Sequence, residues 1–410
     1  MSAKSRQVPQ ADVMIAGAGL AGRVLALCLA EAAGRDLDIR LIDGAPGPGG
    51  HDDIRAYALT PGARQMFEML GVWQRFEHEV QPAHELRIGD CRAEEIIRPI
   101  LLNLQGDTEW GEPIAYFVEA RHLVRAVEQA CDEASIRPAY GRRIRGLERG
   151  PQSIGPLGEP QAARLLVGAD GARSAVRRGA GIGAVEWPYE QSAVVAILKA
   201  EMPHEGAAVQ HFLPSGPFAM LPLPEDRTGL VWTLPTKRAE AVMRLDAEAR
   251  RQEIERAAGP EFGAIEVVEG PLSFPLSLVL ARRYAAERVA LIGDAAHRLH
   301  PLAGLGLNVG LRDAAALAEV VVEAARRGED FGSLHVLERY ARWRRPDAVA
   351  IAAATDGLNR LFAADWGPLR TLRDVGLSLV ERAPRIKARL TQDADGRIVT
   401  PPRLFTGLPI

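Results

Sequence analysis

The sequence predicts an α/β protein in which a Rossmann-type dinucleotide-binding domain is joined to a mostly antiparallel β-sheet and to C-terminal helices. Three observations support this fold class. A strand, a glycine-rich turn and a helix open the chain, short strands separated by Pro and Gly fill residues 185–235, and helical patterns dominate from about residue 307. A chain of 410 residues is long enough for two domains or one large elaborated domain.

The first glycine-rich turn has the pattern of a dinucleotide-binding fingerprint. Residues 12–16 form a short apolar run that we expect to be a buried parallel strand. In the turn that follows, Gly17 makes the tight bend, Gly19 lets the backbone approach a pyrophosphate, and Gly22 lets a helix pack on the strand. A second strand ends in Asp43, which suits a ribose hydroxyl. An ordinary glycine-rich turn is the alternative, and the order of strand, helix and acid argues against it.

Two further junctions place an acid and a glycine at the end of an apolar strand. Asp170 and Gly171 follow one strand, and Gly293 and Asp294 follow the other. The carboxyl ends of parallel strands meet at one edge of a sheet, where such folds bind nucleotides. A structural Asp-Gly turn is an equal alternative at residue 170. Together the three junctions predict FAD, because a nicotinamide dehydrogenase usually needs only the first of them.

The segment of residues 291–308 is the one around which the chain is organised. After Asp294 it crosses a loop rich in Gly and Pro and enters a helix near Leu307, whose N-terminus offers unpaired N–H groups. Those groups suit a phosphate or an electron-rich ring edge, and the acid suits a polyol hydroxyl. His297 and His300 lack partners at metal-ligand spacing, so we expect both to be structural and no metal to bind.

Two arginines are candidate cofactor contacts. Arg55 lies in an Asp53-x-Arg55 segment that follows the first nucleotide-binding unit, and Arg121 opens an amphipathic helix. Each side chain suits a phosphate or a flavin edge. An ordinary surface arginine is the alternative, and local chemistry alone favours it.

The β-rich middle of the chain is the candidate second domain. Three aromatic residues within it, Phe212, Phe218 and Trp232, are candidates for lining the pocket of an aromatic substrate. Burial in an ordinary core is the more frequent role for such side chains, and it remains the alternative.

Composition narrows the class of partner. The formal net charge of −3 gives no bulk attraction to nucleic acid or to anionic membranes. Cys28, Cys91 and Cys131 are isolated, which excludes a disulfide framework and indicates a reducing compartment. The N-terminus lacks the apolar core of a signal peptide, so we expect a cytoplasmic protein.

The C-terminal part is expected to be helical. Residues 334–361 read as one long helix interrupted near Pro346. An apolar stripe follows at helical spacing, and packing is its usual meaning, with a membrane-surface or partner-binding face as the second interpretation. The stripe consists of Leu369, Leu372, Val375, Leu379 and Val380.

These motifs together carry a resemblance to a known family. The motifs are Gly17-x-Gly19-x-x-Gly22, Asp53-x-Arg55-x-x-Ala58-Leu59, Gly168-Ala169-Asp170-Gly171 and Gly293-Asp294-Ala295-Ala296-His297. The set resembles the group A flavoprotein aromatic hydroxylases, which have the para-hydroxybenzoate hydroxylase fold. Further motifs narrow the resemblance to the ubiquinone-biosynthesis hydroxylases. They are His300-Pro301-Leu302-Ala303-Gly304, Gly306-Leu307-Asn308-x-Gly310-Leu311-Arg312-Asp313, Leu70-Gly71-Val72-Trp73 and Val231-Trp232-Thr233-Leu234-Pro235.

The resemblance extends from about Asp12 to Gly396, with one departure. Leu305 occupies a position where the family commonly has Gln, so a polar contact near the flavin is missing. The resemblance implies three FAD-binding segments, a substrate domain built from two segments, and a C-terminal helical region. The FAD-binding segments are 1–80, 106–182 and 281–330, the substrate segments are 81–105 and 183–280, and the helical region is 331–410.

The activity that the resemblance implies is that of a flavin monooxygenase. NADPH or NADH reduces FAD, O₂ adds at flavin C4a, and the resulting hydroperoxide hydroxylates the ring of a polyprenylated phenol in ubiquinone biosynthesis. The residues implied to contact FAD are Gly17, Gly19, Gly22, Asp43, Arg55, Arg121, Asp170, Gly171, Asp294, Gly304, Gly306, Leu307 and Asn308. Pro301 would shape the oxygen site, Asp170 and Gly171 would also support the approach of NAD(P)H, and no residue is assigned as general base.

Two alternatives retain FAD. The first is a different aromatic substrate, or halogenation, which is disfavoured because only part of the halogenase Trp-x-Trp-x-Ile-Pro motif is present, around Trp232. The second is a non-catalytic FAD- or lipid-binding subunit of a quinone-synthesis complex. In each case we expect a small-molecule partner and no nucleic acid, with a quinone-biosynthesis complex and peripheral contact with the inner membrane as further partners.

Overall fold

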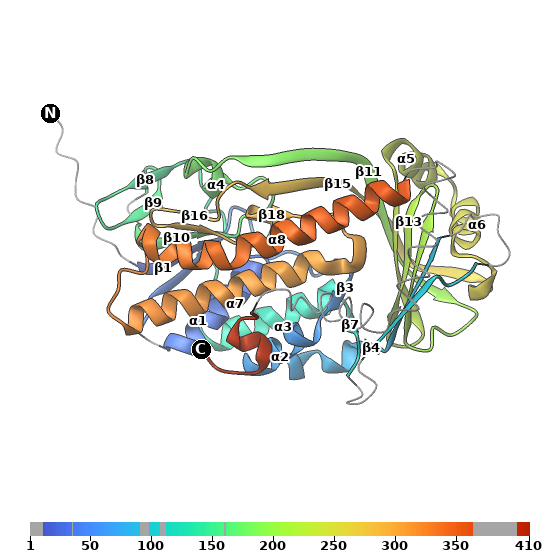
Figure 1. Ribbon diagram of the computed structural model, residues 1–410, viewed down its shortest axis with the longest axis horizontal. Coiled ribbons are helices and arrows are strands. Elements are labelled where there is room, and N and C mark those ends of the chain that lie inside the picture. Colours follow the sequence, from blue (N-terminus) through green and yellow to red (C-terminus); the bar gives the residue numbers. More distant parts are fainter. Residues whose placement is uncertain (1–10, 35, 91–97, 107–111, 160, 364–399) are drawn as a thin grey trace.

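The computed structural model describes most of the chain (Figure 1). The described residues are 11–34, 36–90, 98–106, 112–159, 161–363 and 400–410. They form a seven-stranded sheet, an eight-stranded sheet and a three-stranded sheet, together with helices that cover them. Among the described helices, none has the length and apolar character that crossing a membrane requires.

The seven-stranded sheet contains the nucleotide-binding topology. Its strands are β1 (Ala11–Ala16), β2 (Ile39–Ile42), β8 (Leu147–Arg149), β9 (Ile154–Pro156), β10 (Ala163–Gly168), β16 (Ala285–Ala286) and β17 (Val289–Leu291). The main path runs β16-β17-β10-β1-β2, and β1 is parallel to β2 and β10 while β10 is parallel to β17. The carboxyl ends of these parallel strands therefore share one edge, and the three acid-bearing junctions meet there, as the sequence predicts.

Four long helices pack beside this sheet (Figure 1). They are α1 (Leu20–Ala33), α3 (Ala120–Glu133), α7 (Leu305–Arg326) and α8 (Leu334–Ala363). Helix α1 contacts α3 and α7, and α7 contacts α8. The buried core beneath them uses the β-branched strand residues that the pattern predicted, such as Val13, Ile15 and Val167, which are fully buried. This core fixes the strand ends that carry the site.

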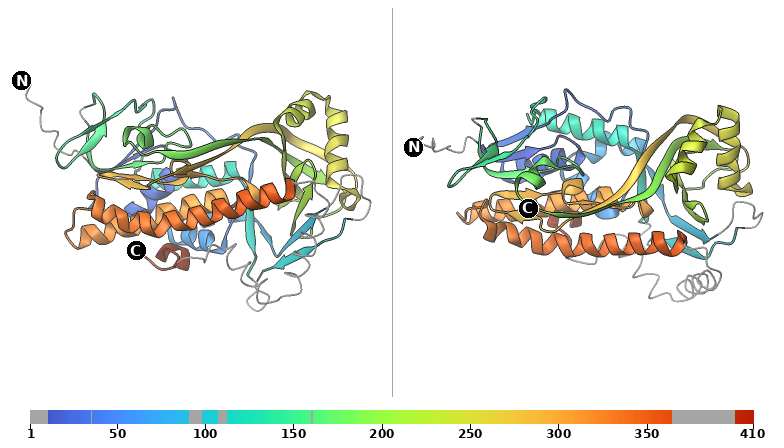
Figure 2. Two further views of the ribbon diagram at one scale, coloured as in Figure 1. Left: turned by 45° about the horizontal axis from the view of Figure 1, so that its top comes forward. Right: turned by 90° about the horizontal axis from the view of Figure 1, so that it is seen from above.

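The eight-stranded sheet is mostly antiparallel, as the sequence predicts, and has the order β18-β15-β11-β14-β13-β12-β5-β6. Its strands are β5 (Glu85–Asp90), β6 (Leu102–Gln105), β11 (Ala184–Ala200), β12 (Ala207–Leu213), β13 (Gly216–Leu223), β14 (Arg227–Pro235), β15 (Ile265–Ala281) and β18 (His297–Arg298). The pair β12–β5 is parallel. The long strands β11 and β15 run from beside the first sheet to the far end of the molecule, and so connect the two large sheets (Figure 2).

The remaining elements fill the junction and the outer faces. The three-stranded sheet consists of β3 (Ala56–Leu59), β7 (Ala115–Glu119) and β4 (Gln81–Ala83). The other α-helices are α2 (Pro61–Met69), α4 (Ala175–Gly179), α5 (Thr236–Arg244) and α6 (Ala247–Ala258). The 3₁₀ helices are η1 (Trp73–Arg75), η2 (Glu77–Glu79), η3 (Pro260–Phe262), η4 (Gly293–Ala295), η5 (Leu302–Gly304) and η6 (Arg403–Thr406).

The charged segment of residues 239–258 is divided between two helices, α5 and α6, because the Asp246 side chain accepts a hydrogen bond from Ala249 N and starts the second helix. The interruption expected at Pro346 is absent, and α8 continues through it, which costs one backbone donor. The apolar stripe at residues 369–380 lies outside the described residues.

Candidate functional site

The fingerprint turn leaves space at one glycine and none at the other two. A Cβ added to Gly17 would lie 2.2 Å from the carbonyl oxygen of Ala169, and one added to Gly22 would lie 1.9 Å from that of Gly17. No atom lies within 4 Å of a Cβ added to Gly19, which is the N-cap residue of α1 and makes no side-chain cap. Open space beside uncapped N–H groups at a helix N-terminus fits a pyrophosphate.

The first acid is attached to this turn. The carboxylate of Asp43 accepts a hydrogen bond of 2.6 Å from Ala18 N and one of 2.7 Å from Ala45 N. It therefore fixes the fingerprint loop to the end of β2. Arg23 supports the same loop from α1, because its Nε donates to the Ala18 carbonyl at 2.7 Å and its Nη2 pairs with Glu128.

The carboxylate of the second acid, Asp170, accepts hydrogen bonds from residues at the start of a helix. One oxygen of Asp170 accepts from Ser174 Oγ at 2.5 Å, and the other accepts from Ala175 N at 2.7 Å. These contacts fix the N-terminus of α4, and Gly171 makes the turn with φ +75°. The structural alternative for Asp170 is therefore realised here, while both residues still line the cavity described next.

A cavity of about 880 Å³ joins the second and third junctions. Asp170, Gly171 and Asp294 line one side of it, and the bridging strands β11 and β15 line the other. Arg173 and Arg298 add positive charge to its wall. Among the described residues Asp294 accepts no hydrogen bond, and its side chain is exposed, so its carboxylate is available to a ligand.

The loop after β17 is anchored by a carboxylate that the site prediction did not include. Asp313 on α7 is fully buried and accepts hydrogen bonds from Gly293 N (3.2 Å), His297 Nε2 (2.6 Å) and Arg344 Nε (3.0 Å). Burial alone would raise the pKa of Asp313, but His297 and Arg344 bring it below its ordinary value. The contact confirms the structural role expected for His297. The signal that could have identified Asp313 is its position directly before the apolar run of residues 314–318 in α7.

The side chain of Asn308 connects α7 to the end of β3. Its Oδ1 accepts from Thr60 N at 3.0 Å, and its Nδ2 donates to the Ala58 carbonyl at 2.7 Å. The amide is thus used within the protein. Contact with a flavin at this position would come from the backbone of the loop and not from this side chain.

The N-terminus of α7 is open. Gly304 is its N-cap residue in the left-handed conformation, with φ +64° and no side-chain cap. A Cβ added to Gly306 would meet no atom within 4 Å. Leu305 and Leu307 are half-buried and pack against the main core. The first turn of α7 therefore offers N–H groups beside open space, which fits the electron-rich edge of a flavin ring.

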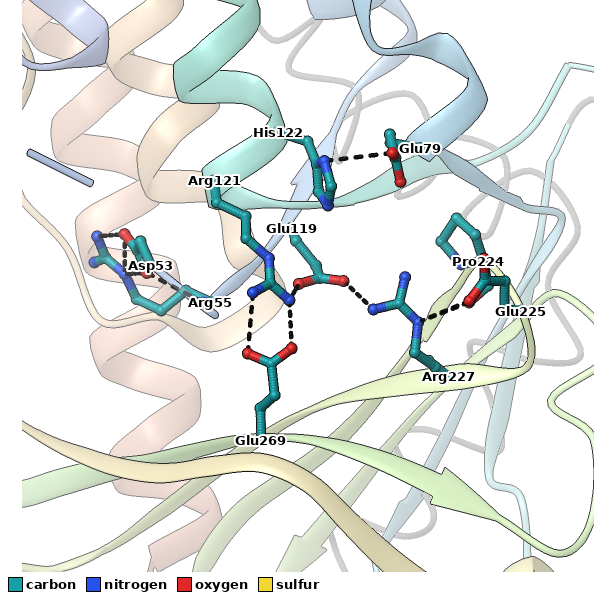
Figure 3. A network of polar contacts seen from close by, with 10 residues as sticks. All are labelled: Asp53, Arg55, Glu79, Glu119, Arg121, His122, Pro224, Glu225, Arg227 and Glu269. Carbon is teal, nitrogen blue, oxygen red and sulfur yellow. Dashed lines mark hydrogen bonds and ion pairs between the residues drawn. The ribbon is translucent and has the colours of Figure 1, made fainter. Parts of the chain in front are cut away.

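Arg55 lies beside the third junction and is paired with a neighbouring acid (Figure 3). Its guanidinium makes hydrogen bonds of 2.5–3.0 Å to the carboxylate of Asp53, and these raise the pKa of Arg55. Its Cζ lies 5.5 Å from the ring centre of Tyr57 and 5.7 Å from that of Phe274, and the charge of Asp294 also acts on it. The side chain is 46% exposed, so an anionic ligand can reach it. Sequence reasoning did not identify the two aromatic rings.

Arg121 belongs to an ion-pair network between α3 and the bridging strand β15 (Figure 3). Its guanidinium binds both oxygens of Glu269, at 3.0 and 2.6 Å, and it also pairs with Glu119. The carboxylate of Glu119 is 1% exposed and is bound on its other side by Arg227 at 2.6 Å. The network joins α3 to strands of the eight-stranded sheet, and the pairing of Arg121 with Glu269 lowers the pKa of that acid.

The three predicted substrate aromatics lie on two different faces of the sheet. Phe218 and Trp232 form an edge-to-face pair 5.6 Å apart in a core that includes residues of α5 and α6, which is the structural alternative. Phe212 stacks on Phe362 of α8 at 3.6 Å and shares a buried cluster with Leu302, the residue after Pro301. Of the three, Phe212 therefore lies beside the loop that contains Pro301 and Leu302.

The fold and the three convergent loops define an FAD-dependent monooxygenase of the para-hydroxybenzoate hydroxylase type. A family model described as an FAD binding domain matches residues 10–355. A solved structure with the same fold is p-nitrophenol 4-monooxygenase PnpA from Pseudomonas putida DLL-E4, with a TM-score of 0.77 and 18% identity over 95% of this chain and 99% of that chain.

Curated relatives identify the branch of this class. Ubiquinone hydroxylase UbiL of Rhodospirillum rubrum is 38% identical over 411 residues, covering 98% of this chain and 94% of that protein. The 3-demethoxyubiquinol 3-hydroxylase of Escherichia coli is 31% identical over 401 residues, covering 94% and 98%. The chain belongs to the FAD-binding ubiquinone hydroxylase family.

Proposed function

We propose that this protein hydroxylates the aromatic ring of a polyprenylated phenol in ubiquinone biosynthesis, with NAD(P)H as reductant and O₂ as oxygen donor. The observation that supports the proposal is the position of the apolar cluster of Phe212, Leu302 and Phe362, which lies directly beside the loop proposed to face the flavin. The aromatic ring of an apolar substrate bound there would lie next to the proposed oxygen site. The names of the relatives at 31–38% identity support the same substrate class.

The residues of the chain have distinct roles in holding FAD. We assign the pyrophosphate to the fingerprint turn of Gly17, Gly19 and Gly22, where α1 presents uncapped N–H groups. Asp43 is assigned to the adenosine ribose and Asp294 to the ribityl chain. Both assignments follow from the position of the acids at the shared sheet edge, because a carboxylate accepts hydrogen bonds from hydroxyl groups.

Backbone N–H groups and two arginine side chains are proposed to stabilise negative charge around the flavin ring. The N–H groups of Gly304, Gly306, Leu307 and Asn308 are proposed to face the pyrimidine edge and to stabilise negative charge there. Arg55 and Arg121 flank the cofactor. Both are held by carboxylates within the protein, so binding of a phosphate would replace or share those partners.

We assign Pro301 and Phe212 to the side of the site where oxygen is transferred to the substrate. When bound, FAD accepts a hydride from NAD(P)H and activates O₂, so the cofactor carries the oxygen chemistry. Pro301 shapes the oxygen site, and Phe212 contacts the substrate. The cavity at Asp170 and Gly171 is the proposed approach for NAD(P)H, since Arg173 and Arg298 line it and suit a phosphate. The chain's share is to bind, orient and exclude water.

The decisive experiment follows oxygen into the product. Purified holoenzyme is supplied with NADPH or NADH, ¹⁸O₂ and a prenylated phenol, and the ring product is examined by mass spectrometry. One ¹⁸O atom is expected in the ring and the other in water, with nicotinamide oxidation stimulated by the phenol. Incorporation into an unprenylated aromatic acid alone would refute the ubiquinone assignment, and binding of FAD and lipid without incorporation would identify a non-catalytic subunit.

A further inference from the structure

A cluster of buried and partly buried polar side chains lies beside the proposed oxygen site, apart from the residues assigned to FAD. It consists of Tyr189 from β11, His300 from the loop after β18, and Asp356 and Asn359 from the last turns of α8, and is termed the His300 cluster. His300 is 1% exposed and Asn359 is 4% exposed. The rings of Tyr189 and His300 meet edge to face, 5.0 Å between centres.

Four buried polar atoms of this cluster make no hydrogen bond of full geometry among the described residues, although the side chains of Tyr189 and Asp356 lie close enough to interact with each other. They are Tyr189 Oη, His300 Nε2, Asp356 Oδ1 and Asn359 Oδ1. The opposite ends of two of these side chains are fixed, because Asn359 Nδ2 donates to Gln191 Oε1 at 3.1 Å and Asp356 Oδ2 pairs with Arg360 Nε at 2.9 Å. Leaving buried polar atoms unpaired is costly, so four in one place indicate a ligand or bound water.

The protonation states define what the cluster can bind. His300 Nδ1 accepts a hydrogen bond from Leu302 N at 3.2 Å, so the ring proton lies on Nε2. Burial lowers the pKa of His300 to about 4, against the opposing charge of Asp356, and the ring is therefore neutral at neutral pH. Burial, followed by Asp356, raises the pKa of Tyr189, which keeps its hydroxyl protonated. The cluster thus presents two donors and two acceptor oxygens.

The cluster is continuous with the apolar side of the site. His300 directly precedes Pro301, and Leu302 belongs to the cluster of Phe212 and Phe362. Asn359 and Phe362 are three residues apart on α8, so they lie on one side of that helix. A polar end and an apolar end therefore adjoin along the same loop and the same helix, which matches a ligand with an oxygen substituent beside a hydrocarbon chain.

We propose that the His300 cluster binds the hydroxyl group of the aromatic substrate, with His300 Nε2–H donating to the substrate oxygen and Asp356 Oδ1 accepting the hydroxyl proton. This inference rests on the proposed function and names the polar contact of that site. It also replaces the purely structural role that the sequence suggested for His300. No proton is transferred in this contact, so the role is to bind and orient the ring.

The test compares a phenol with its methyl ether, which retains the oxygen but lacks the donated proton. Oxidised holoenzyme is titrated with 2-geranylphenol and with 2-geranylanisole, and binding is followed by the change in flavin absorbance. We expect the natural chain to bind the phenol about tenfold to a hundredfold more tightly than the ether. Asp356→Asn is expected to reduce this preference to less than about threefold. His300→Phe is expected to weaken binding of both ligands and to leave the preference in place, because the ether oxygen also accepts from His300 Nε2.

A matched control and a second variant keep the test decisive. His211 is also buried and is paired with Glu261 at 2.9 Å, so His211→Phe should perturb the fold comparably while leaving the preference for the phenol unchanged. If His300→Phe retains no FAD, Asp356→Asn on α8 is the variant that decides the test, through its loss of preference for the phenol.

The outcomes separate the two proposals. Equal preference in all variants, or no preference in the natural chain while prenylated phenol is still hydroxylated, would overturn the role of the His300 cluster, indicate that bound water fills it, and leave the proposed function standing. A different result is a preference that depends on Asp356 but is seen with unprenylated phenol only. That result would retain the cluster as a phenol site and refute the ubiquinone assignment.

Discussion

We predict that the buried carboxylate of Asp313 holds in place the loop after β17, which contains Gly293 and His297. Asp313→Asn keeps the shape of the side chain but removes the charge opposite Arg344 and the strong acceptor for Gly293 N and His297. Breaking a fully buried ion pair by removing one partner costs about 3–5 kcal/mol. Arg344 retains Asp347 at 2.8 Å, so we expect the lower end of that range. Since a domain is stable by only about 5–15 kcal/mol, the loss is large.

Urea unfolding of the FAD-free protein measures this effect. The midpoint should fall while the denaturant dependence stays constant, and the dissociation constant for FAD should rise because the loop loses its anchor. Asp330→Asn is the control, since Asp330 pairs with Arg288 but is 42% exposed, and it should cost less than about 1 kcal/mol. A stability for Asp313→Asn within 1 kcal/mol of the control would refute the reasoning.

The effect of Asp313→Asn on stability is also expected to depend on pH. The pKa of Asp313 in the folded protein lies below its ordinary value of 3.8. A depressed folded-state pKa contributes stability that is present above the unfolded-state pKa and is lost as the pH falls through the folded-state pKa. The stability difference between the natural chain and Asp313→Asn should therefore be constant between about pH 5 and 8 and shrink below about pH 4.

Two further predictions concern FAD itself. Gly19→Ala should change the stability of the FAD-free protein by no more than about 0.5 kcal/mol. The same variant should weaken FAD binding at least about tenfold in a fluorescence titration. Gly22→Ala should instead lower the melting temperature, because its Cβ would lie 1.9 Å from a carbonyl oxygen. Unchanged FAD affinity in Gly19→Ala would exclude the pyrophosphate from this turn. Asp294→Ala should lower flavin occupancy of the purified protein more than Trp232→Phe, and equal occupancy would contradict the assignment of Asp294.

The sequence could predict the parts of the fold that depend on local pattern. Each parallel strand is a short apolar run followed by a glycine or an acid, so the strand ends and their common edge follow from residues close together in the chain. The short β-rich runs of β12 to β14 and the helical spacing of apolar residues in α7 are also patterns of residues that are close together in the sequence. The fold class and the FAD cofactor were predictable for this reason.

The details of the site depend on contacts between distant residues. Arg121 and Glu269 are 148 positions apart, and nothing near either residue indicates the other. The pairing of Phe212 with Phe362 likewise depends on where α8 ends relative to β12. The pairing of β12 with β13 places Phe218 opposite His211, so Phe212 faces the other side of the sheet, and the sequence alone does not give this register. These contacts require the folded structure.

The three strand-end acids show why a shared sequence pattern does not assign a shared role. Asp43 and Asp170 both accept hydrogen bonds from backbone N–H groups nearby, so their carboxylates already stabilise the loops that they end. Asp294 is exposed, and among the described residues nothing donates to it. A carboxylate held by the backbone can still accept from a hydroxyl through its remaining lone pairs, but removing it also disturbs the loop. Asp294 is therefore the acid at which cofactor binding can be separated from folding.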